Sequence, residues 1–515
     1  MIIELYEGTL RNRDQLCREL QVVQSPDRRD TERAILEAGW RRWGRELVGH
    51  LYGSFAFAIR DQEEGTLFCA RDPFGIQSFY YHAAKDGAFL YGTDLGGIVS
   101  SPHYIKALDR QALQLYVLFG YPIGARTLYE GIRKLMPGCS LLWDGTSIQI
   151  DRWYPLSFRP EPAPSAEEWA DRIDHTLQEI LDEDRSNFDF TAAASFLSGG
   201  VDSSYLLAAS GIRRAIGIGF QDGEADETEL AAATAAEFGA RFCKVRISAE
   251  EYFDVIPRFL RNAELPLADP SAPAFAFGCE QTTGETEVYL SGEGADEFFD
   301  GYYVYRRAEE LGREDALYCG CYGVLGQTEG IRLLGGAEEA FPLETLVRET
   351  SMQNHGAEPL SRMLAVDIAL WLEGDILFGV GRSARANGIT LLLPFADRRM
   401  FELSAAIPAA FKRKDETAKY ILRKAAETRL PHVIAFRPKV GFSVPVKRWF
   451  REERFRGRIE RVLFGAASRA CFDQEILQNC WCSFLEGSDE VWPIPYMVYI
   501  FVIWYENCFA SDCLG

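Results

Sequence analysis

The sequence predicts two kinds of fold in succession, an α+β layered part and then an α/β part on a parallel sheet. Up to about residue 155, short segments rich in β-branched and aromatic residues follow one another with turn residues between them, as in 53–61 and 65–72. From about residue 190, apolar strands alternate with helices. That alternation is typical of a doubly wound parallel sheet.

Size and charge restrict the class of protein. The chain has 515 residues, 47% of them hydrophobic and 25% charged, which predicts a soluble globular protein of two or more domains. Its net charge of −21 argues against broad nucleic-acid binding, which requires basic surface. We find no run of 18 apolar residues and no signal-peptide pattern at the N-terminus. The most apolar late segment, 496–509, fits a buried helix.

The twelve cysteines are interpreted as reduced and mostly buried thiols. Two pairs, Cys319/Cys321 and Cys480/Cys482, have CxC spacing, but no second pair stands at zinc-site spacing. A chain of this length builds its core without disulfides. We therefore expect a cytoplasmic protein without a membrane or nucleic-acid partner.

The elements of the N-terminal part follow from periodicity. Segments 11–23 and 30–44 are predicted to be amphipathic helices, and 53–61, 65–72 and 78–84 strands. A stretch rich in Pro and Ser at 156–166 reads as a linker. Ser165 and Glu168 have the spacing of a capping box that opens a helix. We expect domains at 1–155 and 167–515.

In the second part, strands are predicted at 192–197, 215–220, 242–247 and 286–292, with helices between them. From about residue 355 the chain is predicted to be largely helical. The first strand runs into SGGVDSS, a glycine turn that opens a helix at about Asp202. This place, the carboxyl end of a parallel strand, is where open α/β sheets bind ligands.

The turn has the chemistry of a phosphate-binding loop. Glycines let the backbone approach an anion, and a helix N-terminus directs free N–H groups at it. Its spacing is neither GxxxxGK[ST] nor GxGxxG. It resembles the loop of ATP pyrophosphatases, which split ATP between its α and β phosphates. The predicted loop residues are Leu197, Ser198, Gly199, Gly200, Val201, Asp202, Ser203 and Ser204.

A second glycine turn lies at 289–302, YLSGEGADEFFDGY. Glu293, Asp296 and Glu297 stand within five residues there and repel one another unless a cation or a basic group lies between them. Asp296 is predicted to share Mg²⁺ with Asp202, because Mg²⁺ takes carboxylate and phosphate oxygens.

A third segment, 419–450, is basic in an acidic protein. One of its charges is expected to stabilise polyphosphate charge during reaction, and Lys439, inside RPKVGF, fits best. The segment's basic residues include Lys419, Arg423, Lys424, Arg437, Lys439 and Lys447.

Together these stretches resemble glutamine-dependent asparagine synthetase over nearly the whole chain. ADPSAP at 268–273 and LPFADRRMFELSAAIP at 393–408 are similar to later landmarks of that family, and 51–61 and 70–81 to its glutaminase. The resemblance implies an N-terminal-nucleophile (Ntn) hydrolase sandwich before an ATP-pyrophosphatase domain. It also implies that Ile218, Ser291 and Gly292 frame the adenosine, that Glu293 acts on the acyl-adenylate, and that Lys439 holds pyrophosphate.

The N-terminus departs from the family's Met-Cys-Gly, whose freed cysteine is the nucleophile. The chain begins MIIELYEGTL, its nearest cysteine, Cys17, lies in a predicted helix, and the glutamine-binding turn reads Glu7-Gly8-Thr9. Asp30 still matches an acid of that site. We expect a glutaminase-like domain without glutamine hydrolysis.

The residues expected to border the carboxylate substrate also depart from the family. Thr390, Leu391 and Leu392 replace residues that are usually charged, which argues against aspartate as substrate, while Asp375 and Arg382 remain. β-Lactam synthetases and lasso-peptide cyclases share the lost cysteine and attack the adenylate with an amine of the same substrate. This chain nevertheless keeps Glu293 in the asparagine-synthetase form SGEGADE.

The leading hypothesis is an AMP-forming amide ligase that uses ATP and Mg²⁺ on a small-molecule or peptide carboxylate. An asparagine synthetase with a mis-set start, a non-catalytic regulatory homologue and a tRNA-modifying pyrophosphatase are the alternatives. An ammonia-supplying or substrate-delivering protein and a second copy of the chain are the partners that remain open.

Overall fold

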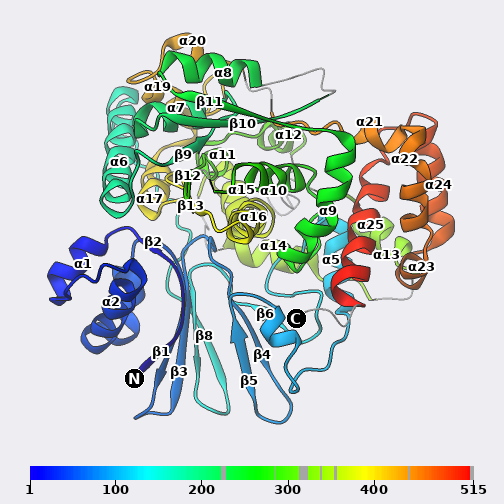
Figure 1. The fold of residues 1–515 in the computed structure, drawn as a ribbon, viewed down its shortest axis with the longest axis horizontal. Helices are drawn as coiled ribbons and strands as arrows, with labels where there is room; N and C mark the ends of the chain where they lie inside the picture. The colour runs from blue at the N-terminus through cyan, green and yellow to red at the C-terminus, as the bar shows by residue number, and fades with distance from the viewer. Residues whose placement is uncertain are drawn as a thin grey trace.

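The computed structural model describes residues 1–221, 228–284, 286–312, 323–336, 339–352, 357–438 and 441–510. Strands β1 to β8 form a sandwich at one end of the molecule, and a parallel sheet with helices around it forms the rest (Figure 1). This confirms the predicted fold class. No helix within these ranges combines the length and apolarity that crossing a membrane requires.

The N-terminal sandwich has two antiparallel sheets, ordered β1-β2-β3-β7-β8 and β5-β4-β6. Its strands are β1 (Ile2–Leu10), β2 (Gly53–Asp61), β3 (Thr66–Arg71), β4 (Tyr80–Ala83), β5 (Phe89–Gly92), β6 (Arg133–Lys134), β7 (Cys139–Trp143) and β8 (Ile148–Arg152). Its helices are α1 (Arg13–Leu20), α2 (Arg28–Trp43), α3 (Leu47–His50), α4 (Gly96–Val99) and α5 (Arg110–Phe119), with a 3₁₀ turn η1 (Gly44–Glu46). The predicted helices and strands of this part are confirmed.

The second sheet is parallel throughout and has the order β11-β10-β9-β12-β13. Its strands are β9 (Ala194–Phe196), β10 (Arg214–Phe220), β11 (Arg241–Ile247), β12 (Val288–Leu290) and β13 (Thr390–Leu392). The chain begins this sheet in the middle, at β9, and adds strands first on one side and then on the other. The order therefore reverses between β9 and β12, which makes a switch point there.

Helices cover this sheet and extend beside it (Figure 1). The helix α6 (Ala166–Asn187) opens with the predicted capping box of Ser165 and Glu168. The helices up to β13 are α7 (Val201–Ser210), α8 (Thr228–Glu237), α9 (Ala249–Ala263), α10 (Ser271–Thr282), α11 (Ala295–Phe299), α12 (Tyr303–Glu310), α13 (Gln327–Leu333), α14 (Leu343–Met352), α15 (Pro359–Asp367), the π-helix η2 (Ile368–Leu377) and α16 (Phe378–Ala386).

The chain after β13 is helical, as predicted. Its helices are α17 (Arg398–Ala406), α18 (Ala409–Lys412), α19 (Tyr420–Ala426), α20 (His432–Ala435), α21 (Val446–Arg451), α22 (Glu453–Leu463), α23 (Ala466–Cys471), α24 (Gln474–Leu485), α25 (Pro493–Trp504) and the π-turn η3 (Tyr505–Phe509). Every residue of α25 from Ile494 to Trp504 is buried, which confirms the predicted buried helix. The nine cysteines in the described ranges are free thiols, and six are buried; Cys319 and Cys321 lie outside those ranges.

Two buried ion clusters join the sandwich to the second part. Arg11, at the end of β1, contacts Asp184 of α6 and the N-cap residue of α17, Asp397, each at 2.9 Å. Glu373 of η2 lies between Arg71 of β3 at 3.0 Å and Lys134 of β6 at 2.8 Å. We call this second group the bridge cluster.

Candidate active site

Two glycine turns meet at the switch point of the parallel sheet. One follows β9 and opens α7, and the other follows β12 and opens α11. A Cβ atom added to Gly292 would lie 3.2 Å from the Cβ of Asp202. The turns are therefore packed against each other, and a larger residue at 292 would separate them.

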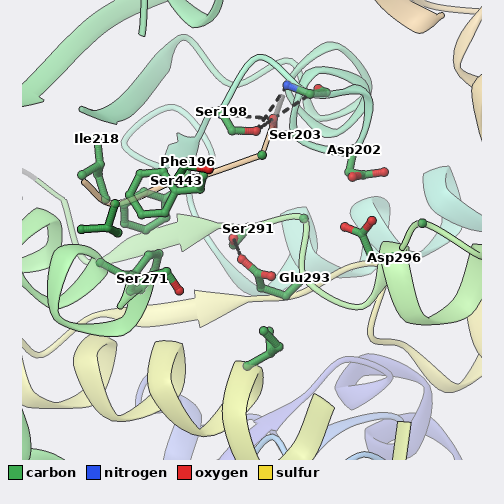
Figure 2. A pocket seen from close by; sticks show the side chains of 18 of the residues that line it. Phe196, Ser198, Asp202, Ser203, Ile218, Ser271, Ser291, Glu293, Asp296 and Ser443 are labelled. Carbon is green, nitrogen blue, oxygen red and sulfur yellow. Dashed lines mark hydrogen bonds between the residues drawn. The ribbon is translucent and has the colours of Figure 1, made fainter. Parts of the chain in front are cut away.

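The first turn is held by its own hydroxyls. The backbone N–H of Ser198 donates to Oγ of Ser203, 3.2 Å away, and Gly200 N–H donates to Ser198 Oγ at 3.3 Å (Figure 2). Gly199 has a φ of +84°, a left-handed conformation that glycine adopts without strain. The turn thus presents backbone to a pocket of about 1000 Å³ at this edge of the sheet.

Most of the predicted nucleotide-binding residues line this pocket. They are Leu197, Ser198, Gly199, Gly200, Val201, Asp202, Ser203, Ile218, Ser291 and Gly292, joined by Glu293 and Asp296. Figure 2 shows Asp202 and Asp296 on facing turns, with Ser291 and Glu293 below the first turn. Ser204 is fully buried and does not line the pocket. Lys439 lies outside the described residues.

Asp202 and Asp296 both contact the ammonium group of Lys419. Nζ of Lys419 lies 2.5 Å from Asp202 Oδ2 and 2.8 Å from Asp296 Oδ1. We call these three residues the pocket cluster. Burial alone would lower the pKa of Lys419, but the two carboxylates outweigh it and raise that pKa above its usual value. Lys419 is therefore a cation beside the first glycine turn.

Lys419 is one of the basic residues of segment 419–450, but the sequence alone indicated no specific role for it. It is 1% exposed and has a φ of +55°. At Gly301, an added Cβ would lie 1.9 Å from Asp296 Oδ1 and 2.2 Å from Lys419 Cε, so a larger residue there would displace this ion pair. The glycine of the DGY sequence is the signal that would have pointed to this close approach.

The three acids of the second turn, Glu293, Asp296 and Glu297, avoid mutual repulsion in two ways. Asp296 faces Lys419, whereas Glu297 turns inward and is 1% exposed. Burial, and then the charge of Asp296, raises the pKa of Glu297 to about 8, and Tyr302 donates a hydrogen bond to it at 2.8 Å. Glu297 is thus a neutral support at pH 7. Glu293 remains at the pocket, where it accepts a hydrogen bond from Ser291 at 3.2 Å.

The basic segment lies against the first turn. Arg437 donates to the carbonyl of Gly199 at 3.1 Å. Arg423 donates to the carbonyls of Ala435 and Arg437, at 2.8 and 2.9 Å, which fixes the segment's path. Lys447 also lines the pocket, whereas Lys424 pairs with Glu167 away from it.

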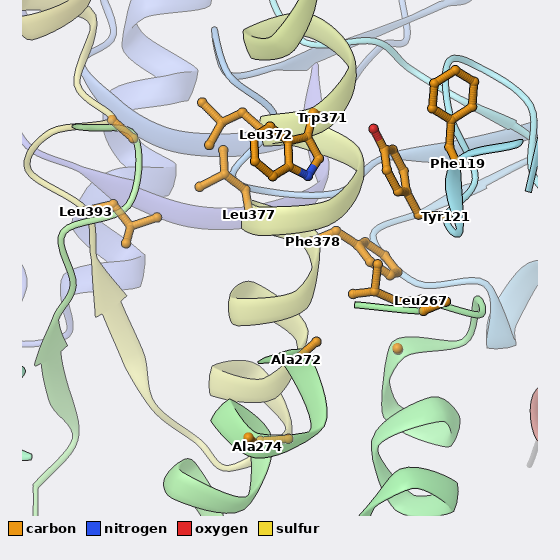
Figure 3. Packing of buried hydrophobic residues seen from close by; sticks show 14 of the residues in the cluster. Phe119, Tyr121, Leu267, Ala272, Ala274, Trp371, Leu372, Leu377, Phe378 and Leu393 are labelled. Carbon is orange, nitrogen blue, oxygen red and sulfur yellow. The ribbon is translucent and has the colours of Figure 1, made fainter. Parts of the chain in front are cut away.

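The π-helix η2 supplies the opposite wall. Trp371 and Asp375 line the pocket, and their neighbour Glu373 belongs to the bridge cluster. Gly374 packs against the ring of Tyr121, which faces this helix in Figure 3. π-Helical turns are frequent at functional sites because they change which side chains share a face. Thr390, Leu391 and Leu392, expected on the substrate side, lie in β13 and do not line the pocket.

The fold and the site define an α/β protein with two glycine turns and a carboxylate pair at a sheet switch point. Comparison with known proteins agrees. Residues 184–506 match the family described as asparagine synthase, and residues 2–154 match the glutamine amidotransferase domain. The chain therefore belongs to the asparagine synthase family and is an ATP-dependent amide-forming ligase.

Individual relatives cover most of the chain. Asparagine synthetase [glutamine-hydrolyzing] 1 of Bacillus subtilis is 28% identical, over 97% of this chain and 85% of its own length. A putative asparagine synthetase [glutamine-hydrolyzing] of Mycobacterium bovis is 31% identical, over 81% of this chain and 71% of its own. The amidase chyE of Penicillium rubens is 25% identical, over 59% of this chain and 47% of its own.

Proposed function

We propose that the protein adenylates a carboxylate with ATP, releases pyrophosphate, and transfers the acyl group to an amine with release of AMP. The observation that carries this proposal is the pocket cluster, where Asp202 and Asp296 share one lysine at the junction of the two glycine turns. A substrate carboxylate oxygen attacks the α-phosphorus, and the bond to the β-phosphate oxygen breaks. The amine nitrogen then attacks the acyl carbon, and AMP leaves.

The chain's own groups suit these steps. Backbone N–H groups at the start of α7 and the Lys419 ammonium favour the charge that develops on the leaving pyrophosphate. We infer that Glu293, one of the carboxylates that line the pocket, accepts the proton of the attacking amine. Lys439 is proposed as a second cation for pyrophosphate, from the family resemblance alone.

The residues present also fit Mg²⁺. Oδ1 of Asp202 is buried without a hydrogen-bond partner within the described residues, and carboxylate oxygens are the ligands that Mg²⁺ prefers. Asp202 and Asp296 would hold the ion, which neutralises polyphosphate charge when bound.

We also propose that the domain at residues 1–155 does not hydrolyse glutamine. The cysteines of this part are Cys17, Cys69 and Cys139, and all three are buried. Burial raises the pKa of each thiol, which lowers its fraction of nucleophilic thiolate. An amine within the substrate, or free ammonia, then supplies the nitrogen. Cyclisation of a specialised substrate or peptide, as in β-lactam synthetases and lasso-peptide cyclases, is the form of this function that needs no ammonia.

Aspartate amidation is the second candidate, because relatives over most of the chain are named asparagine synthetases. The test is nucleotide analysis of full-length protein with ATP, Mg²⁺ and a panel of carboxylates that includes aspartate, each with ammonia or with glutamine. We expect AMP and pyrophosphate to form in equal amounts, and no glutamate from glutamine. Formation of ADP and phosphate contradicts the adenylation, and glutamate release contradicts the inactive glutaminase.

A further inference from the structure

Two backbone segments meet at the pocket cluster in strained conformations. Five non-glycine residues in the described part of the chain have a positive φ, and three of them are Asp300, Asp415 and Lys419, at +63°, +51° and +55°. Asp300 ends the helix α11, which carries Asp296, and Lys419 directly precedes α19. Left-handed backbone is costly for residues other than glycine and persists only where the surroundings enforce it. Contacts near the cluster must therefore hold both segments.

A buried ion pair joins the two segments. The guanidinium of Arg413 contacts both carboxylate oxygens of Asp300, with Nε 2.7 Å from Oδ2 and Nη2 2.9 Å from Oδ1. Asp300 is 1% exposed. Burial raises the pKa of Asp300 to about 6 although Arg413 acts against this, so the carboxylate is ionised at pH 7. Glu309 contacts the same guanidinium at 2.7 Å, but its side chain is exposed.

Short backbone links connect this ion pair to the pocket cluster. The N–H groups of Asp300 and Gly301 both donate to the carbonyl of Asp296, which closes the end of α11. On the other segment, the first and last residues of 414–417 exchange two backbone hydrogen bonds, at 3.2 and 2.9 Å. They form a tight turn between the arginine and Lys419. Each member of the ion pair is thus only a few residues of ordered backbone away from a member of the pocket cluster.

The identity of residue 300 points to more than a helix end. Glycine is the usual residue at a left-handed helix end, because it has no Cβ to strain. Asp300 adopts this conformation with a side chain, and that side chain is directed at Arg413. A residue needed only to end α11 would not require a carboxylate. The carboxylate therefore has a second effect, which is to fix the segment that leads to Lys419.

We propose that Asp300 and Arg413 are positioning residues for Lys419: their ion pair keeps the ammonium group in the pocket cluster, where it faces the polyphosphate of the nucleotide. The proposal rests on the proposed function for the presence of that polyphosphate. Neither positioning residue lines the pocket, so both act through the lysine and not on the substrate. Loss of the ion pair is expected to displace the ammonium group and to weaken phosphate binding.

The test measures binding of magnesium pyrophosphate to the full-length protein by calorimetry. Asp300→Asn is the informative variant, because asparagine tolerates a left-handed φ and keeps the shape but loses the charge. We expect it to bind pyrophosphate at least fivefold more weakly than the wild type. Glu309→Gln, which removes the exposed carboxylate from the same arginine, is the matched control and should bind within twofold of the wild type. Equal binding by wild type and Asp300→Asn, or no binding by the wild type, overturns the proposal.

Lys419→Met separates positioning from general destabilisation. This variant is expected to bind pyrophosphate at least tenfold more weakly, and adding Asp300→Asn to it should weaken binding no further, although the melting temperature should still fall. An equal loss of affinity in both backgrounds overturns the proposal, because the ion pair would then act on the pocket without the lysine. Should Asp300→Asn fail to fold, Asp300→Gly relieves the strain and lacks the carboxylate; the same fivefold loss is expected, and unchanged binding overturns the proposal.

The proposal and the proposed function fail separately. AMP formation from ATP is measured for the wild type and for Asp300→Asn with the panel of carboxylates. AMP formation by the wild type, together with unchanged pyrophosphate binding in Asp300→Asn, overturns the positioning role but leaves the ligase function standing. Weaker pyrophosphate binding in Asp300→Asn, with no AMP formed by the wild type from any carboxylate, does the reverse.

Discussion

The bridge cluster and the pocket cluster each contain two charges of one sign and one of the other, but they differ in burial and in pairing. All three residues of the bridge cluster are buried, whereas in the pocket cluster only Lys419 is buried and the two aspartates are partly exposed. In the bridge cluster, each oxygen of Glu373 receives a donor, one from Arg71 and one from Lys134. In the pocket cluster, Lys419 contacts one oxygen of each aspartate and leaves Oδ1 of Asp202 unmatched. The first is complete without a ligand, and the second is not.

This difference separates charges that hold the fold from charges that bind. Burial raises the pKa of Glu373, but Lys134 and Arg71 outweigh it and leave that pKa below the usual range. A carboxylate in that state is ionised and fully paired. Glu373 lies two residues from both Trp371 and Asp375, which line the pocket. The fully paired bridge cluster therefore also fixes the pocket wall that carries Asp375, whose Oδ1 has no hydrogen-bond partner among the described residues.

The comparison is tested most strongly by Glu373→Gln, which leaves Arg71 and Lys134 buried without a countercharge. Breaking a buried ion cluster by removing one member costs about 3–5 kcal/mol of unfolding free energy. We expect a loss of that size in denaturant melts. Glu37→Gln, which breaks an exposed pair with Arg41 in α2, is the control and should change stability by less than about 0.5 kcal/mol. A loss below about 1 kcal/mol for Glu373→Gln would show that the bridge cluster does not hold the two parts together.

In the pocket cluster, Asp202→Asn is expected to act on turnover instead. The variant keeps the shape of the turn but removes a charge that faces phosphate, and loss of one electrostatic group at a reacting centre lowers turnover by about 10²–10³-fold. AMP formation from ATP measures this effect, with melting temperature as the check on folding. Cys17→Ala is the control and should leave AMP formation unchanged, since this thiol lies in the sandwich core. Turnover within threefold of wild type in Asp202→Asn would remove our assignment of the site.

The sequence was sufficient for features that depend on neighbouring residues. The turn after β9, the turn after β12 and the capping box at Ser165 are local, and each was predicted from spacing. The approach of the two turns followed from one rule, that parallel strands end at the same edge of a sheet. The helix α7 begins at Val201, one residue earlier than expected, and Ser203 faces the pocket while Ser204 is buried.

The features that the sequence left unassigned depend on distant contacts. Lys419 is 217 residues from Asp202, and its role depends on a left-handed φ that no propensity specifies for lysine. Glu373 reaches Lys134 across 239 residues. Asp269 and Asp375 were noted in motifs, but their shared wall results from α10 and η2 packing around the pocket. Charge complementarity between remote segments is not visible in spacing, because many acids and bases satisfy it equally well.

Lys412 is a further buried basic group. Like Asp202, it has a polar atom without a hydrogen-bond partner among the described residues, but it does not line the pocket. It is 1% exposed, its Nζ has no hydrogen-bond partner among the described residues, and burial lowers its pKa to about 7 despite the charges of Asp300 and Glu358. Between pH 7 and the unfolded value near 10.5, the unfolded chain binds more protons at this site than the folded chain does. Stability should therefore rise with pH across that range.

Lys412→Met should remove this dependence, because methionine has similar length and no proton to bind. At pH 7 we expect the variant to be more stable by about 1–3 kcal/mol, and its melting temperature to be flatter between pH 7 and 9 than that of the wild type, since each pKa unit corresponds to about 1.4 kcal/mol. AMP formation should not change, because no ligand completes this site. A variant that is less stable than wild type at pH 7 would show that Asp300 and Glu358 pair with Lys412 strongly enough to make it a structural charge, like those of the bridge cluster.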